Sequence, residues 1–190
     1  MKRITFYGPN SKGEAKTIRT GTRAIIEKDG RILFSYLGKR HQYLLPGGGM
    51  EKGETPRENA IREVQEECGL AIDPKDPFIV VDEYYGDFMW RDYYCVCSIT
   101  GTVPVNYDLK EIELEISNRW MEKEKAIEAL MEAKMDPVDL VGKPEYRLFV
   151  TLNSHYREAM VLSLLYGNAI PAIPQTLLNR TLARLEYTET

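Results

Sequence analysis

The sequence has few cysteines and no long apolar run. Three of its 190 residues are cysteines, namely Cys68, Cys95 and Cys97. An odd number leaves one thiol unpaired in any disulfide scheme, and the spacing does not suit a zinc site, so we expect a reducing, cytoplasmic location. No segment reaches the roughly 18 consecutive apolar residues of a membrane-spanning helix, and the first residues lack the apolar run of a signal peptide. We therefore expect no membrane partner.

The chain also lacks an excess of positive charge. It has 25 Lys and Arg residues against 29 Asp and Glu, which gives a formal net charge of −4. Binding to nucleic acid through its phosphates needs a basic surface, so we expect no nucleic-acid partner. The composition, 43% hydrophobic and 28% charged, is typical of a globular protein and excludes a disordered chain. A length of 190 residues suits one domain of about 140 residues with an extension.

Segments rich in β-branched and aromatic residues predict a sheet. Residues 22–28 and 31–37 are separated by an Asp-Gly dipeptide, which favours a tight hairpin. A short apolar piece over 43–45 leads into Pro-Gly-Gly-Gly at 46–49, which we expect to be a loop passing close to another group. Further strands are predicted over 78–85, 92–103 and 112–121, and a helix over 122–135.

The clearest helix is predicted over residues 56–68. Thr55 is a favourable N-cap, Glu58 completes a capping box, and Gly69 lies where a C-terminal cap is expected. Pro56 suits the first helical position, where its missing N–H has no helical partner to lose.

Three carboxylates share one face of this helix. At about 100° per residue, Glu63, Glu66 and Glu67 fall within an arc of about 100°. Like charges so close together repel one another, and a hard divalent cation with oxygen ligands would offset that repulsion. Mg²⁺ typically takes one or two protein carboxylates and also binds substrate phosphates. Together with the preceding glycine loop, this face predicts a site for a metal-bound phosphoryl compound.

The same residues resemble the Nudix box, the signature of the Nudix hydrolases. The segment Gly48-x5-Glu54-x7-Arg62-Glu63-Val64-x-Glu66-Glu67-x-Gly69-Leu70 matches every fixed position of that box. The wider resemblance covers roughly residues 20–135. It implies an α+β fold, in which a mixed β-sheet is sandwiched between helices. It also implies hydrolysis of a nucleoside diphosphate linked to another moiety, by water attack on phosphorus assisted by Mg²⁺ or Mn²⁺. Nucleotide sugars, ADP-ribose, dinucleoside polyphosphates and nucleoside triphosphates are the candidate substrates.

The resemblance implies roles for individual residues. Glu63, Glu66 and Glu67 correspond to the metal-binding glutamates, with the carbonyl of Gly47 completing the shell. A charged pair that orients the helix corresponds to Arg62 and Glu54.

The general base is less defined. Within the family it is either a box glutamate, here Glu63, or a glutamate on a later loop, for which Glu111, Glu113 and Glu115 are the candidates. We favour Glu113.

Other residues leave alternatives open. Arg40 and Gly48 flank or belong to the loop and are candidates for substrate binding, although a solvated turn is the other interpretation of Arg40 and its neighbour His41. The aromatic residues between Tyr84 and Tyr94 suit either a nucleobase-binding surface or an ordinary hairpin core. His155 is interpreted as a structural residue.

The tail lies outside the family core, so we divide the chain into a Nudix hydrolase domain over 1–140 and a C-terminal helical extension over 141–190. Apolar residues at three- and four-residue steps predict two amphipathic helices, around 149–164 and 177–185. They are expected to pack either on the same domain or on a partner subunit in a homodimer. The alternative to an enzyme is a non-hydrolytic nucleotide-binding or regulatory Nudix module.

Overall fold

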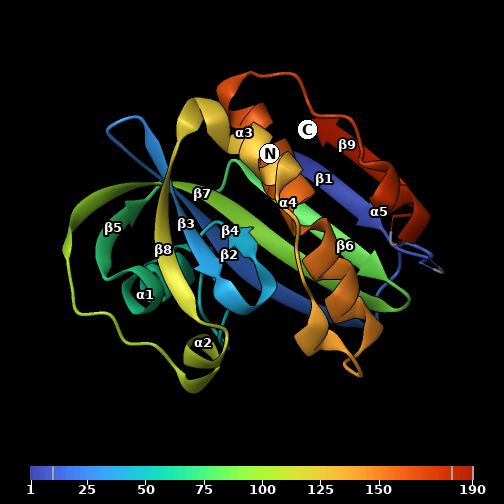
Figure 1. Cartoon of the computed structure of the whole chain (residues 1–190), viewed down its shortest axis with the longest axis horizontal. Helices are drawn as coiled ribbons and strands as arrows, with labels where there is room; N and C mark the ends of the chain where they lie inside the picture. Colours follow the sequence, from blue (N-terminus) through green and yellow to red (C-terminus); the bar gives the residue numbers. More distant parts are fainter. Residues whose placement is uncertain (10, 181, 190) are drawn as a thin grey trace.

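The computed structural model describes residues 1–9, 11–180 and 182–189, and within them it does not describe the side chains of residues 110 and 138. A mixed β-sheet crosses the molecule, with α1 on one face and α3 and α4 on the other (Figure 1). The fold is therefore α+β, as predicted. The helices are Pro56–Cys68 (α1), Leu109–Glu113 (α2), Lys123–Glu132 (α3), Glu145–Tyr166 (α4) and Gln175–Arg180 (α5), with 3-10 turns at Gly38–Arg40 (η1) and Val138–Leu140 (η2).

The sheet mixes parallel and antiparallel pairs. Neighbouring strands run in the order β4-β3-β2-β7-β6-β1-β9, while β5 pairs with β7 and β8 pairs with β3. The β2–β7 and β1–β6 pairs are parallel and the others are antiparallel. The strands span Lys2–Tyr7 (β1), Thr17–Lys28 (β2), Arg31–Leu37 (β3), Gln42–Leu44 (β4), Leu70–Pro74 (β5), Ile79–Tyr85 (β6), Phe88–Thr102 (β7), Ile116–Glu122 (β8) and Arg184–Glu189 (β9).

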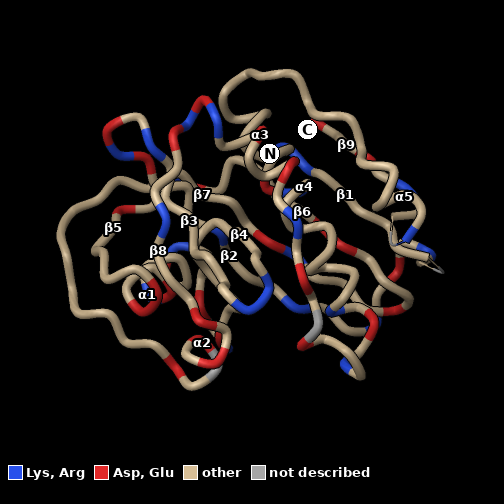
Figure 2. Tube along the Cα trace, viewed as in Figure 1, with Lys and Arg blue, Asp and Glu red and all other residues tan. Residues whose placement is uncertain are grey.

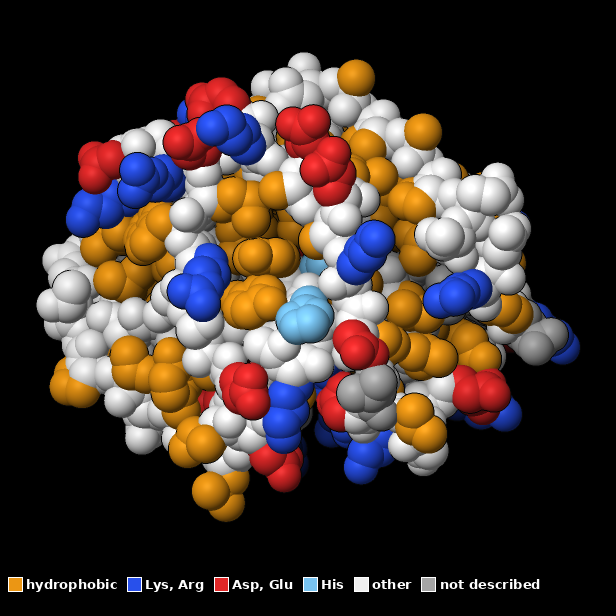
Figure 3. Space-filling model, viewed as in Figure 1, with side chains coloured by type: hydrophobic (Ala, Val, Ile, Leu, Met, Phe, Trp, Pro, Cys, Tyr) orange, Lys and Arg blue, Asp and Glu red, His pale blue; other side chains and the backbone are white. Residues whose placement is uncertain are grey.

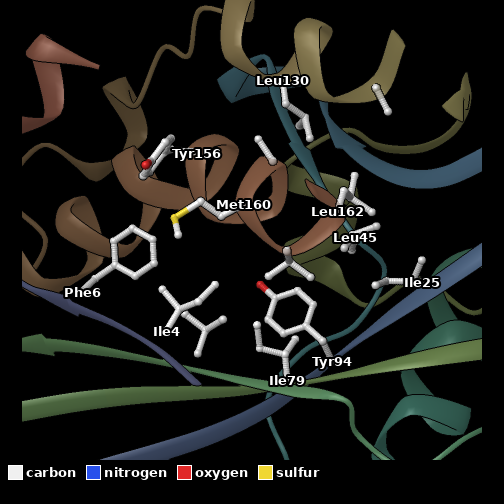
Figure 4. Close-up of a cluster of buried hydrophobic side chains, with 14 of the residues drawn as sticks. Ile4, Phe6, Ile25, Leu45, Ile79, Tyr94, Leu130, Tyr156, Met160 and Leu162 are labelled. Carbon is white, nitrogen blue, oxygen red and sulfur yellow. The ribbon is translucent and has the colours of Figure 1, made fainter. Parts of the chain in front are cut away.

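Alternation along β2 explains why helices cover both faces of the sheet. Ala24 and Ile26 belong to the hydrophobic cluster under α1, whereas Ile25 between them belongs to the cluster under α3 and α4. Successive side chains on a strand point to opposite faces, so a run that is buried throughout requires cover on both sides. In the second cluster, Tyr156 and Met160 of α4 lie over side chains of the sheet such as Ile4 (Figure 4).

Local signals placed α1 and the first hairpin correctly. Thr55 caps α1, the capping box with Glu58 is formed, and Gly69 ends the helix in the left-handed region with φ 65°. At the hairpin between β2 and β3, Asp29 and Gly30 both have positive φ, the geometry that the dipeptide predicts.

The prediction for the end of the tail is wrong. Instead of a second amphipathic helix around 177–185, the chain forms the short α5 and then β9, which pairs antiparallel with β1. Three of the leucines that suggested a helix still pack on the core. Leu177 and Leu182 are buried, and Leu185 packs against the same cluster from strand β9. The otherwise unpaired edge of β1 supplies backbone hydrogen bonds that a second helix would not use.

The predicted strand over 112–121 begins too early. Residues before Glu115 form α2, and β8 starts only at Ile116, because Glu115 adopts a positive φ of 56° that interrupts extended backbone. Helix α2 leaves Leu109 and Ile112 exposed, and apolar side chains protrude at the lower edge of the molecule over this helix (Figure 3).

The sequence patterns do not predict strand β1.

The first part of the tail is the predicted helix. α4 spans 22 residues and buries side chains in the same cluster as β1, β6 and α3. None of the helices in the described part of the chain is long and apolar enough to span a membrane.

Candidate active site

A cleft of about 350 Å³ opens where the glycine loop meets the sheet. Its walls come from α1, the loop at 47–49, strands β2, β3, β4, β7 and β8, the α2 segment, the turns η1 and η2, and α4. The volume lies within the range of about 300–1,000 Å³ typical of small-molecule sites. Two of the box glutamates, Glu63 and Glu67, line this cleft.

Glu67 is a buried residue of the cleft wall. Its Oε2 accepts a hydrogen bond from Ser35 Oγ at 2.9 Å and another from the Gly47 N–H at 3.2 Å. Burial, reinforced by the nearby charge of Glu63, raises the pKa of Glu67 to about 7. The two hydrogen bonds therefore hold this carboxylate in position. The positive charge of the described residues around it does not compensate for its burial, so its ionised form is disfavoured.

Glu63 lies against the glycine loop. A β-carbon added to Gly48 would stand 2.5 Å from Glu63 Oε2, so the loop approaches this carboxylate as closely as it does only because residue 48 is glycine. Burial also raises the pKa of Glu63, against the opposing effect of Arg62, whose Nη1 lies 2.9 Å from Glu63 Oε1.

Arg62 connects the outer carboxylates. Its Nε donates to Glu54 Oε1 at 2.7 Å, its Nη1 donates to Glu66 Oε2 at 3.0 Å, and its Nη2 donates to the Gly49 carbonyl at 3.1 Å. The hydrogen bonds from Arg62 lower the pKa of Glu54 to about 2. Arg62 thus joins α1 to the segment that precedes it, the geometry expected of a residue that orients the helix.

The carbonyl of Gly47 already has one donor. Arg23 Nη1 donates to it at 2.6 Å, and the same nitrogen lies 3.3 Å from the Leu45 carbonyl. A carbonyl oxygen has two lone pairs, so this hydrogen bond leaves one for a further partner.

The donor set fits a hard divalent cation. Glu63, Glu67 and Gly47 all line the cleft and together have two carboxylates and a backbone carbonyl, and two carboxylates with raised pKa values repel one another until a cation offsets them. Among the residues that the structure describes, however, no three His, Cys, Asp or Glu side chains lie together in a ready-made metal cluster. Two carboxylates and a carbonyl suit Mg²⁺, which usually keeps several of its waters.

The structure does not bring every predicted residue into the cleft. Glu66 is paired with Arg62 and is not a lining residue, and Glu113 is exposed on α2. Glu111, two residues earlier, does line the cleft. Arg40 lines it too, but its guanidinium is bound to Asp139, with Nη2 donating to Oδ2 at 2.6 Å.

Sequence reasoning missed two sets of lining residues. One is Arg23, whose signal was a cation directly before the apolar run at 24–26, because a charge on a buried stretch of strand needs a specific partner. The other is the wall formed by α4, which includes Tyr146, Arg147 and Thr151. Nothing in the spacing of the tail indicates that its first helix reaches the cleft.

Comparisons with known proteins indicate the family. The family model of the NUDIX domain matches residues 18–140. The chain is 37% identical over 51 residues to an uncharacterized Nudix hydrolase, YvcI, from Bacillus subtilis, covering 27% of this chain and 32% of that protein. It is 38% identical over 56 residues to an RNA pyrophosphohydrolase from Aeromonas hydrophila, covering 30% of this chain and 31% of that protein. The matched segments thus span about a third of the length of these curated relatives.

Among solved structures, a NUDIX hydrolase from Nitrosomonas europaea is similar with a TM-score of 0.53 at 19% identity, covering 64% of this chain and 83% of that one. Such a likeness supports the fold. The family model covers well over half of the sequence, and two glutamates of the box, Glu63 and Glu67, line the cleft together with the loop at 47–49. The chain therefore belongs to the NUDIX domain family.

Proposed function

We propose that this protein is a pyrophosphohydrolase that requires Mg²⁺ or Mn²⁺ and acts on a nucleoside diphosphate linked to another moiety. The observation that carries the proposal is that Glu63 and Glu67 line a cleft of ligand size together with Gly47, whose N–H donates to Glu67. The names of the similar Nudix hydrolase and RNA pyrophosphohydrolase support the same reaction class.

Five residues of the chain would form and support the metal site. Glu63 and Glu67 would hold the cation, with the Gly47 carbonyl as a third ligand, while Arg62 and Glu54 would hold α1 in position against the loop. When bound, a divalent cation offsets phosphate charge and lowers the pKa of a bound water. Most of the rate enhancement in phosphoryl transfer comes from such positioning and charge neutralisation.

The proton acceptor would be Glu63 or a glutamate of the α2 segment. Within that segment Glu111 lines the cleft and Glu113 does not, so we assign the second possibility to Glu111. Comparing Glu111→Gln with Glu113→Gln separates these two residues, because loss of a general base lowers kcat by about 10²- to 10⁴-fold.

The central test is Glu67→Gln, assayed with a panel of nucleotide sugars, ADP-ribose, dinucleoside polyphosphates and nucleoside triphosphates in Mg²⁺ and Mn²⁺. We expect kcat to fall by about 100-fold or more and Mn²⁺ binding, followed by electron paramagnetic resonance, to weaken. Glu128→Gln, at an exposed position on α3, is the matched control. Wild-type protein that binds nucleotides without releasing phosphate-containing products would favour the regulatory module instead.

Location and assembly are part of the same proposal. Cys68, Cys95 and Cys97 are all unpaired buried thiols, which supports a reducing, cytoplasmic environment. A homodimer remains a prediction that light scattering tests.

A further inference from the structure

Acidic and basic side chains lie on different walls of the cleft. Its carboxylates come from α1 and from the segment at 108–111, where acidic residues are seen in Figure 2. Its arginines come from β2, η1 and α4. A ligand that binds its metal-associated phosphates at the carboxylates therefore has basic surface available on the remaining walls.

Two of these arginines stand out because they have no acidic partner among the residues that the structure describes. Arg23, Arg40 and Arg157 are each paired with a carboxylate. In the part of the chain that the structure describes, neither Arg19 nor Arg147 has a carboxylate oxygen within 4.0 Å. Both are exposed residues that line the cleft, so their guanidinium groups are available to an anionic ligand.

Arg19 lies beside an aromatic ring. It is in register with Trp90 across the parallel β2–β7 pair, which places both side chains on the same face of the sheet. The indole also reaches the glycine loop, because a β-carbon added to Gly49 would stand 3.8 Å from its ring. A cation and a large aromatic surface thus adjoin the loop of the Nudix box.

The facing wall is held rigidly. Tyr146 of α4 stacks on Phe88 of β7, with ring centroids 4.0 Å apart and an angle of 25° between the planes. The first turn of α4 also contacts the β6–β7 hairpin, since Tyr85 Oη donates a hydrogen bond to Glu145 Oε2 at 2.6 Å. These contacts hold the first turn of α4, which carries Arg147, and that helix lies beyond the residues that the family model matches.

We propose that Arg19, Trp90, Tyr146 and Arg147 bind the nucleoside monophosphate unit of the substrate. Its phosphate lies between the two guanidinium groups, which match phosphate geometry through paired N–H donors, and its base stacks on the indole. A neutral sugar at this place would leave both arginines without an anionic partner. The assignment rests on the proposed function and extends it, because it makes the C-terminal helix α4 part of substrate recognition.

The test measures binding without catalysis. Because the chain has two tryptophans, Trp120→Phe leaves Trp90 as the fluorescent reporter. With EDTA present, AMP, GMP, CMP and UMP are titrated, and we expect at least one to quench Trp90. Arg19→Ala and Arg147→Ala should each raise its Kd about 10-fold, the corresponding nucleoside should bind at least about 10-fold more weakly, and inorganic phosphate should leave the fluorescence unchanged.

Two controls keep this test specific. Arg31→Ala removes an exposed arginine of β3 outside the cleft and should leave the Kd unchanged. Arg19→Lys and Arg147→Lys keep the charge but lose the paired donors, so they should fall between wild type and the alanine variants, and they replace an alanine variant that fails to fold.

The outcomes separate this inference from the proposed function. Glu67→Gln should bind the monophosphates as tightly as wild type while losing hydrolysis. If Glu67→Gln abolishes hydrolysis but no monophosphate quenches Trp90 at millimolar concentration, or both alanine variants bind as wild type does, the inference is overturned and the enzyme assignment stands. Quenching that depends on both arginines in a protein without hydrolytic activity would support the binding site and overturn the reaction.

Discussion

Arg23 Nη1 donates to the carbonyl oxygen of Gly47 at 2.6 Å, joining the middle of β2 to the glycine loop. Arg23 Nε lies 3.5 Å from Asp92 Oδ2, and Arg157 Nη1 of α4 lies 3.8 Å from that same oxygen. These contacts form a continuous path from the C-terminal helix to the loop. The buried charges thus place a backbone carbonyl of the proposed metal site.

Replacing Arg23 with methionine tests this path. Arg23→Met removes the donor to Gly47 and leaves Asp92 with one cation fewer in a buried environment. Breaking a buried ion pair from one side costs about 3–5 kcal/mol, which we expect in the free energy of unfolding measured with urea. Arg31→Met, on the surface of β3, should change it by less than about 0.5 kcal/mol. If the two variants have the same free energy of unfolding, the contacts that run from α4 through Asp92 and Arg23 to the glycine loop do not stabilise the fold.

A methyl group on Gly48 should disable the site without unfolding the protein. In Gly48→Ala the new β-carbon would collide with Glu63, whose Oε2 is 2.5 Å away, so the carboxylate must move. A displacement of about 1 Å at a reacting centre can cost about 100-fold in rate, and we expect a loss of that order in kcat. Gly101→Ala is the matched control, since its β-carbon would make only an ordinary contact at 3.7 Å with Ala71. Retained activity in Gly48→Ala would contradict the placement of Glu63.

Glu83 should make stability depend on pH. Burial, aided by Asp92, raises the pKa of Glu83 to about 7 in spite of its ion pair with Arg157. A carboxyl group with a raised folded-state pKa binds its proton more tightly in the folded protein, so its contribution to stability is lost as pH rises from about 4.5 to about 7. The free energy of unfolding of Glu83→Gln, compared with that of wild type, should therefore increase by on the order of 1–3 kcal/mol across that pH window, measured by urea unfolding at each pH. A pH-independent difference would refute the raised pKa.

His155 should produce the opposite dependence. Its buried Nε2 accepts the Tyr43 N–H at 2.9 Å, and burial lowers the pKa of His155 to about 4. The unfolded chain then binds a proton before the folded one does, so stability is lost as pH falls from about 6.5 to about 4, by roughly 2–3 kcal/mol.

His155→Gln, which keeps a hydrogen-bond acceptor, should flatten that acid limb of the stability profile. The chain has two histidines, and His41→Asn is the control, because His41 is exposed and has a φ of 50° that asparagine tolerates. The interpretation fails if the His41 variant, rather than the His155 variant, flattens the profile.

Short-range information was enough for α1, the helix of the Nudix box. Thr55, Glu58 and Gly69 act within one turn of the residues that they cap, so α1 was predicted with its observed bounds, and the spacing of Glu63 and Glu67 placed both at the cleft. The same locality explains the error in the tail, because leucines spaced for a helix also suit a short helix followed by a strand. What favours the strand β9 is the otherwise unpaired edge of β1, which lies far away in the sequence.

By itself, then, the sequence determined the Nudix box, its helix and the carboxylates of the proposed metal site, since each depends on residues close together along the chain. The tertiary structure decided which cation supports Gly47, which glutamate of the α2 segment lines the cleft, and that Arg147 of α4 completes its basic wall. Arg23 and Gly47 are 24 residues apart, and Glu83 and Arg157 are 74 apart. Such contacts form only when the sheet brings distant segments together, so no local pattern predicts them.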